Sequence, residues 1–429
     1  MAFFNRVQRI WTDIELRKKI LFVLAMLVIF RLAAHIPIPG IDAAALRQYF
    51  AQNQVLGILN LFSGGGLENF SIVALGVGPY ITASIIVQLL QMVIPSLEEL
   101  SKEGEQGQRK MNQYMRYLTV PLSFLQSYGL ITILKQSSSL GAQIVASFTL
   151  STWVLTILTL TAGTLFLMWV GELISEKKIG NGVSLLIFAG IVASLPRAAQ
   201  QIIATYTSSQ ILPIAFLVVI AVLTVAAIVY ITEAQRNIPV TYARQVRGSR
   251  TVGGAVTHLP MRVNQAGVIP IIFAISIVLF PPLIAQFFLR VESAALRNAA
   301  ETVIRVFQNQ IFYGVLYFLM VFGFTYFYTA VVFHPDKIAE NLQKQGGFIP
   351  GIRPGKETAT YLSQVSNRIM LAGALFLGVV AVMPVVLQSV FNSSSLVIGG
   401  TSVLIVVSVV IEMMQQINAQ LVMRDYESI

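Results

Sequence analysis

Apolar runs of about twenty residues recur along the whole chain. A run of that length is what an α-helix needs to cross the hydrocarbon core of a bilayer. Only 11% of the 429 residues are charged, about half the share in a soluble protein. The chain is therefore expected to be an all-α membrane protein with ten transmembrane helices, at residues 20–36, 71–94, 117–134, 151–174, 183–203, 211–232, 263–285, 311–333, 367–390 and 396–417.

The positions of the basic residues predict the orientation of the chain. Most of the 29 Lys and Arg residues lie before the first run, in alternate loops and after the last run. Because Lys and Arg collect in cytoplasmic loops, both termini are expected in the cytoplasm. The net charge of +10 then reflects topology rather than nucleic-acid binding. The outer side is expected to carry only Arg47, Lys135, Arg197, Arg290, Arg297 and Arg305, with Arg197 near the outer end of its span.

Two cytoplasmic loops, at about 233–262 and 334–366, are longer than a membrane crossing needs. The first contains the alternating stretch IPVTYARQV, typical of a β-strand, and then Gly253-Gly254, an expected hairpin turn. The second contains GGFIPGIRPG, whose glycines and prolines favour a shaped loop. A docking platform for a cytoplasmic partner is favoured over a flexible tether.

The residue types that catalysis or ion coupling would require are scarce in the spans. No Asp lies in a predicted span, no P-loop pattern occurs, and the three His residues lack metal-ligand spacing. Gly182-Val183-Ser184-Leu185 matches the Gly-x-Ser-x of serine intramembrane proteases, but no His within a span is available to activate Ser184. A helix-packing surface is the preferred interpretation. We expect no enzyme activity, cofactor or metal, but a passive conduit or a scaffold.

A glycine-rich segment precedes the second run. It reads LFSGGGLENF at residues 61–70, and Gly76-Val77-Gly78-Pro79 then interrupts the run itself. Glycine and proline both weaken helices, and non-helical backbone at membrane depth is tolerated only where it lines a cavity or is buried in protein. The residues alone favour an external loop whose glycines turn the chain.

Long stretches of the chain match one known family, in the same order and over nearly the whole length. They include HIPIPGID, NLFSGGGL, ALGVGPYITASIIVQLL, EGEQGQRKMNQYMRY, MWVGELISEKKIGNGVSLLIFAGIVASLP, THLPMRVNQAGVIPIIFA, GGFIPGIRPGKETATYL and GGTSVLIVVSVVIEMMQQI. In these motifs the chain resembles the SecY family. The resemblance implies two pseudo-symmetric five-helix halves, residues 1–205 and 206–429, which form an hourglass pore with a re-entrant plug at about 60–70.

The resemblance also implies a function. Such a channel passes unfolded secretory polypeptides across the bacterial plasma (inner) membrane and releases membrane helices sideways into lipid. A ring of aliphatic side chains seals the waist of the pore, at Val77, Ile81, Val183, Ile187, Ile272 and Ile405. The plug below the ring is expected to include Asn60, Phe62, Gly64, Gly65, Gly66, Leu67, Glu68 and Phe70.

Further roles follow from the same resemblance. The lateral gate lies between spans two, three, seven and eight, where hydrogen bonds across the seam are expected from Thr82, Gln88, Asn264 and Ser276. Docking of the ribosome and of the SecA motor ATPase is assigned to Arg244, Arg247, Arg250, Arg353 and Lys356. Other implied partners are the small membrane subunits SecE and SecG, signal peptides, nascent chains and membrane lipids.

Two other classes of function are open to such a chain. A secondary transporter of small solutes would explain the spans and the broken helices, but not the lack of midplane charges or the two large loops. A non-conducting insertase or scaffold is the third class.

Overall fold

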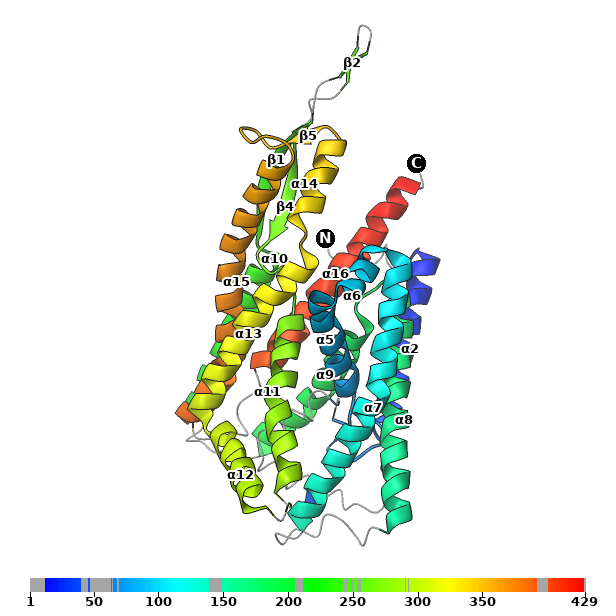
Figure 1. Cartoon of the computed structure of the whole chain (residues 1–429), viewed down its shortest axis with the longest axis vertical. Coiled ribbons are helices and arrows are strands. Elements are labelled where there is room, and N and C mark those ends of the chain that lie inside the picture. The colour runs from blue at the N-terminus through cyan, green and yellow to red at the C-terminus, as the bar shows by residue number, and fades with distance from the viewer. Residues whose placement is uncertain are drawn as a thin grey trace.

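The chain folds into a bundle of helices with a small β-structure at one end (Figure 1). The computed structural model describes residues 12–39, 45–46, 63, 65–67, 69–138, 149–204, 211–242, 245–247, 250–252, 256–289, 291, 293–391 and 400–427.

Each predicted span overlaps one helix of the bundle. These helices are α2 (Ile14–Ala33), α5 (Gly78–Val93), α7 (Glu105–Ser138), α8 (Leu150–Glu176), α9 (Gly182–Ala204), α10 (Ile211–Glu233), α11 (Ile269–Phe288), α13 (Gln310–Val332), α15 (Lys356–Phe391) and α16 (Gly400–Glu427). Among the described residues, length and composition alone qualify five helices to cross a membrane, or six if α5 and its bent neighbour α6 (Pro95–Lys102) form one span. Shorter apolar stretches lie in α9 and α11.

The second span starts later than the sequence predicts. Residues 72–77 form turns, and α5 begins only at Gly78, with Pro79 in its first turn. Proline is well suited to the first turn of a helix because the amide hydrogen that it lacks would have no partner there. Beyond Val93 the chain bends by 103° into α6, which Pro95 begins. The third span is extended in the other direction, because α7 already starts at Glu105.

The helices pack as two sets that meet in two places. In the first set, α5 packs on α7, α7 on α8, and α8 on α9; in the second, α11 packs on α13, α13 on α15, and α15 and α10 on α16. The sets meet where α11 contacts α5 and α7, and again where α16 contacts α9. The largest buried apolar cluster draws residues from both sets.

The two long loops fold against each other. Strand β1 (Gln235–Tyr242) pairs antiparallel with β4 (Val256–Arg262) and with the short β5 (Gly347–Phe348) of the second loop. Helix α14 (Pro335–Lys344) completes the unit, whose apolar core contains Ile238, Val240, Met261, Leu342, Ile349, Leu362 and Val365. The predicted strand and the shaped second loop are both found.

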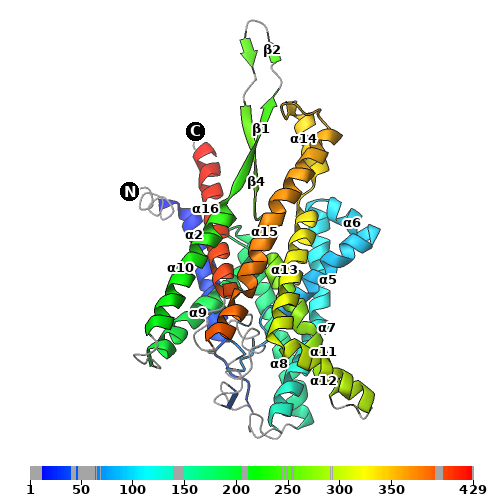
Figure 2. The same cartoon turned by 90° about the vertical axis from the view of Figure 1, so that its left-hand side faces the viewer.

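The predicted hairpin turn, Gly253-Gly254, lies outside the described residues. Strands β2 (Gln245–Arg247) and β3 (Arg250–Val252) pair with Arg247 opposite Arg250, so the chain reverses between these two residues. The register matches that of β1 and β4, so all four strands belong to one long hairpin, whose tip projects beyond the helices (Figure 2).

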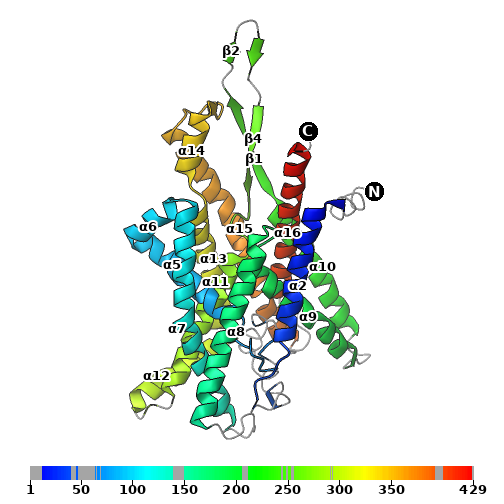
Figure 3. The same ribbon diagram turned by 90° about the vertical axis from the view of Figure 1, so that its right-hand side faces the viewer.

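Two ends of the bundle can be distinguished. The start of α2, the end of α16, the long hairpin and α14 lie at one end (Figure 3). At the opposite end lies α12 (Ala294–Gln308), which connects α11 to α13 and which the span prediction did not anticipate.

Candidate functional site

The six residues of the expected ring come together in one apolar cluster. Five of them are buried, with exposed fractions of 1–5%, and Val183 is partly buried against the same cluster. Val77 and Ile81 come from α5, Val183 and Ile187 from α9, Ile272 from α11, and Ile405 from α16. Residues more than three hundred positions apart in sequence are thus joined in the middle of the bundle.

Local sequence explains how two of these helices present their ring residues. Val77 is the N-cap residue of α5, so the late start of that helix sets the positions of Val77 and Ile81. At the start of α9, the Asn181 side-chain oxygen accepts a hydrogen bond from the backbone amide of Ser184 at 3.2 Å. Asparagine is a favoured capping residue because it satisfies an amide that has no partner within the helix. The cap fixes the turn that holds Val183.

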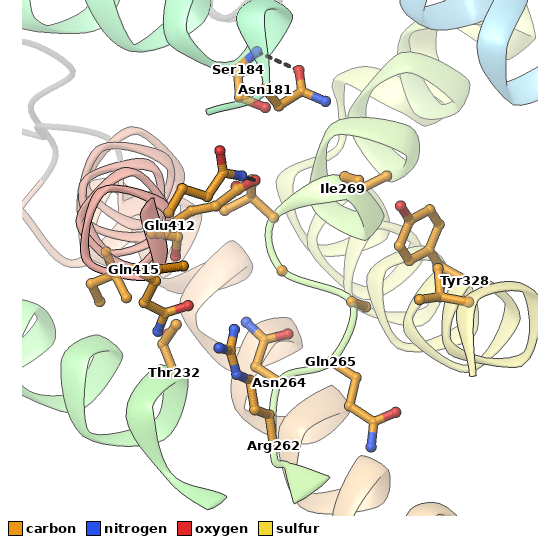
Figure 4. A pocket seen from close by; sticks show the side chains of 18 residues that line it. Asn181, Ser184, Thr232, Arg262, Asn264, Gln265, Ile269, Tyr328, Glu412 and Gln415 are labelled. Carbon is orange, nitrogen blue, oxygen red and sulfur yellow. Dashed lines mark hydrogen bonds between the residues drawn. The ribbon is translucent and has the colours of Figure 1, made fainter. Parts of the chain in front are cut away.

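A cavity of about 440 Å³, lined by both polar and apolar side chains, lies next to the ring residues and reaches Arg262 of β4. Figure 4 shows the side chains that line it. Three of its lining residues lie close to ring residues in sequence. Ser184 directly follows Val183, Val268 lies one helical turn before Ile272, and Ser408 lies one turn after Ile405. Polar side chains surround it: Asn181, Thr232, Arg262, Asn264, Gln265, Glu412, Gln415 and Gln416. A second cavity, of about 810 Å³, shares Asn181, Glu412 and Gln416 with the first. Polar side chains therefore begin within one turn of the ring, in a vestibule that also has apolar walls.

The described part of the expected plug packs beside the ring cluster. Leu67 and Phe70 are buried in a second cluster, formed with Leu130, Ile131 and Leu134 of α7 and Ile157 and Leu160 of α8. Ile72 packs against both clusters. Phe70 has φ of 42°, and Gly65 has φ of 79°; only glycine adopts such angles readily, so Phe70 is held in a strained turn. Asn60, Phe62, Gly64 and Glu68 lie outside the described residues.

Close packing holds the segment that links this turn to α5. A β-carbon at Gly66 would lie 2.9 Å from Ser71 Oγ, and one at Gly163 on α8 would lie 1.9 Å from the Ile72 carbonyl oxygen. The backbone amide of Ile72 donates to the Ile36 carbonyl at 3.0 Å, and that of Ile38 to the Phe70 carbonyl at 2.9 Å. Sequence reasoning did not single out Gly163, whose only signal is the small-residue stretch TAGT.

The four polar residues expected at the lateral gate lie on α5 and α11 or just before α11. Thr82 donates to the Gly78 carbonyl at 3.1 Å, and Ser276 to the Ile272 carbonyl at 2.9 Å, both within their own helices. Gln88 Oε1 and both amide atoms of Asn264 are buried without a hydrogen-bond partner among the described residues. No hydrogen bond links these four residues across the seam in the part of the chain that the structure describes.

The expected docking residues lie on the paired loops. Arg353 and Lys356 are exposed, and the Thr358 hydroxyl donates to the Arg353 carbonyl at 2.9 Å. Gly351 and Gly355, with φ of 82° and 99°, shape the turn that carries Arg353. Arg247 and Arg250 face each other near the tip of the long hairpin, whereas Arg244 falls outside the described residues. On nearby α14, a hydrogen bond from Lys344 lowers the pKa of the Glu340 carboxyl.

The structure also contains polar contacts between helices that the sequence analysis did not predict. Arg116 Nε on α7 lies 2.7 Å from Glu172 Oε1 on α8. Gln415 Nε2 on α16 donates to Glu233 Oε1 on α10 at 2.8 Å, and Lys19 Nζ on α2 donates to Gln420 Oε1 on α16 at 3.2 Å. Sequence did not indicate these pairs, because contacts between residues far apart in the chain leave no local pattern.

Comparisons with known proteins agree with this arrangement. The SecY family model matches residues 71–414. The protein translocase subunit SecY of Streptomyces galbus is 44% identical over 424 residues, which cover 96% of each chain. That of Halalkalibacterium halodurans is 42% identical over 434 residues and 99% of each chain.

Solved structures share the fold. One described as "The structure of a protein conducting channel" aligns with a TM-score of 0.63 at 16% identity, covering 93% of this chain and 91% of that one. A second, Sec61 in the canine ribosome-channel complex from the endoplasmic reticulum, has a TM-score of 0.57 with the same identity and coverage. With a family model over most of its length and curated relatives along nearly all of it, the chain belongs to the SecY family.

Proposed function

We propose that this chain forms the protein-conducting channel of the bacterial plasma membrane. It carries unfolded secretory polypeptides outward and releases apolar helices sideways into lipid. The observation that carries the proposal is the convergence of six aliphatic residues from four helices next to a cavity lined partly by polar side chains. The names of the curated relatives, protein translocase subunit SecY, support the same function.

The ring acts as the seal. An apolar constriction blocks ions because water leaves it, and it makes no sequence-specific contacts. Aliphatic side chains from separate helices close around many different polypeptides, and the polar vestibule keeps an entering chain hydrated until it reaches them. The plug, at about residues 60–70, closes the outer funnel, and the turn at Phe70 is the point about which it moves.

The topology of the proposed channel has ten spans, two five-helix halves related by a pseudo-two-fold axis, and both termini in the cytoplasm. The overlap of each predicted span with one helix supports the span count. The start of α2 and the end of α16 lie at the same end of the bundle as the two long loops. This arrangement supports the proposal that both termini are on the same side of the membrane. The contact of α11 with α5 and α7 is the seam that opens as the lateral gate.

The paired loops form the docking platform in this proposal. A shared apolar core gives them the fixed shape that a partner needs. Arginine binds phosphate and carboxylate groups in a bidentate manner, which suits both ribosomal RNA and an acidic protein surface. We assign the platform to the ribosome and to the SecA motor, and we propose SecE and SecG as the small membrane subunits that accompany the chain. The partners or the membrane potential supply the energy for transport.

Reconstitution tests this function. The full chain, purified together with its accompanying subunits, is placed in vesicles with the motor protein, ATP and a radiolabelled secretory precursor. We expect precursor that is protected from added protease only when the chain is present. Vesicles that accumulate small solutes but never protect a precursor would instead support a secondary transporter.

A further inference from the structure

Helix α12 has an amphipathic pattern that the channel function leaves unexplained. Apolar residues recur at helical spacing in Leu296, Ala299, Ala300, Val303 and Phe307, whereas Arg297, Asn298, Glu301, Thr302 and Arg305 occupy the other face. A helix with one apolar and one charged face is typical of a segment that lies in the plane of a membrane surface.

The position of α12 agrees with that pattern. It joins the end of α11 to the start of α13, at the end of the bundle opposite the β-structure, and it projects sideways from the bundle (Figures 2 and 3). Since α11 and α13 are spans in the proposed topology, their junction lies at the outer membrane interface. The aromatic side chain of Phe307 packs edge-on against that of Phe312 on α13, with 5.6 Å between the two ring centroids. This contact anchors α12 at that position.

The bundle covers only part of the apolar face. Ala300 is buried and Phe307 partly buried, but Leu296 is 46% exposed and Ala299 is exposed as well. In water this exposed surface would be unfavourable, whereas it is stabilised where acyl chains begin. The bilayer must surround the neighbouring spans at this depth, so lipid is the occupant that the position itself supplies.

The charged face of α12 lies at the level of the outer lipid headgroups. Arg290, Arg297 and Arg305 put three basic residues in one loop on the side where the positive-inside rule predicts few. The exposed Arg297 and Arg305 form no ion pair with other described residues. A cavity of about 400 Å³ beside Arg305 is lined by Leu289, Glu301, Ile304 and Gln308, so it combines apolar walls with polar groups. This mixture matches the boundary between a lipid headgroup and its chains.

We propose that α12 lies in the outer headgroup region and that Arg297 and Arg305 bind the phosphates of anionic phospholipids. Glu301 accepts hydrogen bonds from a hydroxylated headgroup such as that of phosphatidylglycerol. Because α12 packs directly on α11, which lines the seam, bound lipid steadies the outer end of one gate helix. The proposal rests on the chain spanning the membrane.

Depth measurements test the position of α12. The chain has no cysteine, so a nitroxide is attached singly at Leu296→Cys and Ala299→Cys on the apolar face and at Asn298→Cys on the polar face, with Val222→Cys on α10 as a lipid-exposed reference. The full complex is placed in vesicles of phosphatidylcholine and phosphatidylglycerol. We expect oxygen to relax the labels at 296 and 299, and a water-soluble nickel chelate to relax the label at 298. Water access at 296 and 299, or access of neither reagent because a protein subunit covers them, would overturn the proposal.

Lipid crosslinking tests the arginines. Photoactivatable phosphatidylglycerol in phosphatidylcholine vesicles is crosslinked to the complex, and peptides from α12 are quantified by mass spectrometry. The Arg297→Gln/Arg305→Gln variant should lose crosslinks several-fold, the Arg297→Lys/Arg305→Lys variant should retain most of them, and Lys135→Gln, an outer cation elsewhere, should leave them unchanged. Equal crosslinking in the double glutamine variant would overturn the phosphate contact. Neither assay requires transport, so their outcome is independent of the reconstitution test above.

Discussion

Gly182 at the start of α9 lies against the backbone of Gly171 on α8 so closely that a β-carbon at Gly182 would come within 1.8 Å of the Gly171 carbonyl oxygen. The contact confirms the helix-packing interpretation of Gly182-Val183-Ser184-Leu185. It also fixes the position from which Val183 and Ile187 reach the ring cluster.

Replacing Gly182 by Ala should destabilise the protein. The added methyl group has no space, so α9 must move away from α8, at a cost of about 1–3 kcal/mol for overpacking. Thermal unfolding of the detergent-solubilised complex, followed by intrinsic fluorescence, should show a lower midpoint than wild type. Gly323→Ala on α13 is the matched control, since a β-carbon there would meet no neighbouring atom within 4 Å. Equal midpoints for both variants would contradict the packing described.

Gly163→Ala should make the resting channel leak ions. Its β-carbon would meet the Ile72 carbonyl oxygen at 1.9 Å and push away the segment that joins the plug turn to α5. Single-channel conductance in planar bilayers should therefore show more frequent openings without any substrate. Gly314→Ala on α13 serves as control, because its nearest neighbours, which include no ring residue, would lie at an ordinary 3.5 Å. If Gly163→Ala channels open no more often than wild type without substrate, this segment does not contribute to the seal.

Val183→Ile should tighten the seal. Val183 is the one ring residue that is only partly buried, so an added methylene has room to extend across the constriction. The residual ion conductance of the resting channel should fall, while Val222→Ile, on an exposed position of α10, should leave it unchanged. An increase in conductance would show that Val183 does not face the constriction.

Arg353→Glu should reduce motor-driven secretion. The turn between Gly351 and Gly355 presents Arg353 to solvent, where a reversed charge would repel an acidic partner surface. Translocation into vesicles should drop several-fold, while the thermal midpoint and copurification of the small subunits stay at wild-type values. Lys135→Glu, on the end of α7 away from the platform, is the charge-reversal control. Undiminished secretion by Arg353→Glu would remove this residue from the docking surface.

Hydrophobic run length located the helices well because the bilayer imposes one length on every span. Their ends were harder to place: Pro79 delayed the start of α5, and a polar, helix-forming stretch extended α7 back to Glu105. Helix α12 was missed because its apolar residues are interleaved with charges.

Local sequence pattern alone could not identify the residues of the candidate site. An Ile on a membrane helix looks the same in sequence whether it faces lipid, a neighbouring helix or a pore, so only the resemblance singled out residues such as Ile272 and Ile405. Long-range contacts such as Gly163 against Ile72, or Arg116 with Glu172, arise from the packing of whole helices and leave no sequence pattern.

Crosslinking of a secretory chain at the ring tests the central proposal most directly. Single cysteines are introduced at Ile81, at Ile405 and, as a lipid-exposed control, at Val222. Each complex is then loaded with a secretory precursor stalled in transit, which carries a cysteine-reactive group in its translocating segment. A pore that runs through the ring predicts strong crosslinks at residues 81 and 405 and none at 222. Crosslinks at 222 without any at 81 and 405 would contradict it.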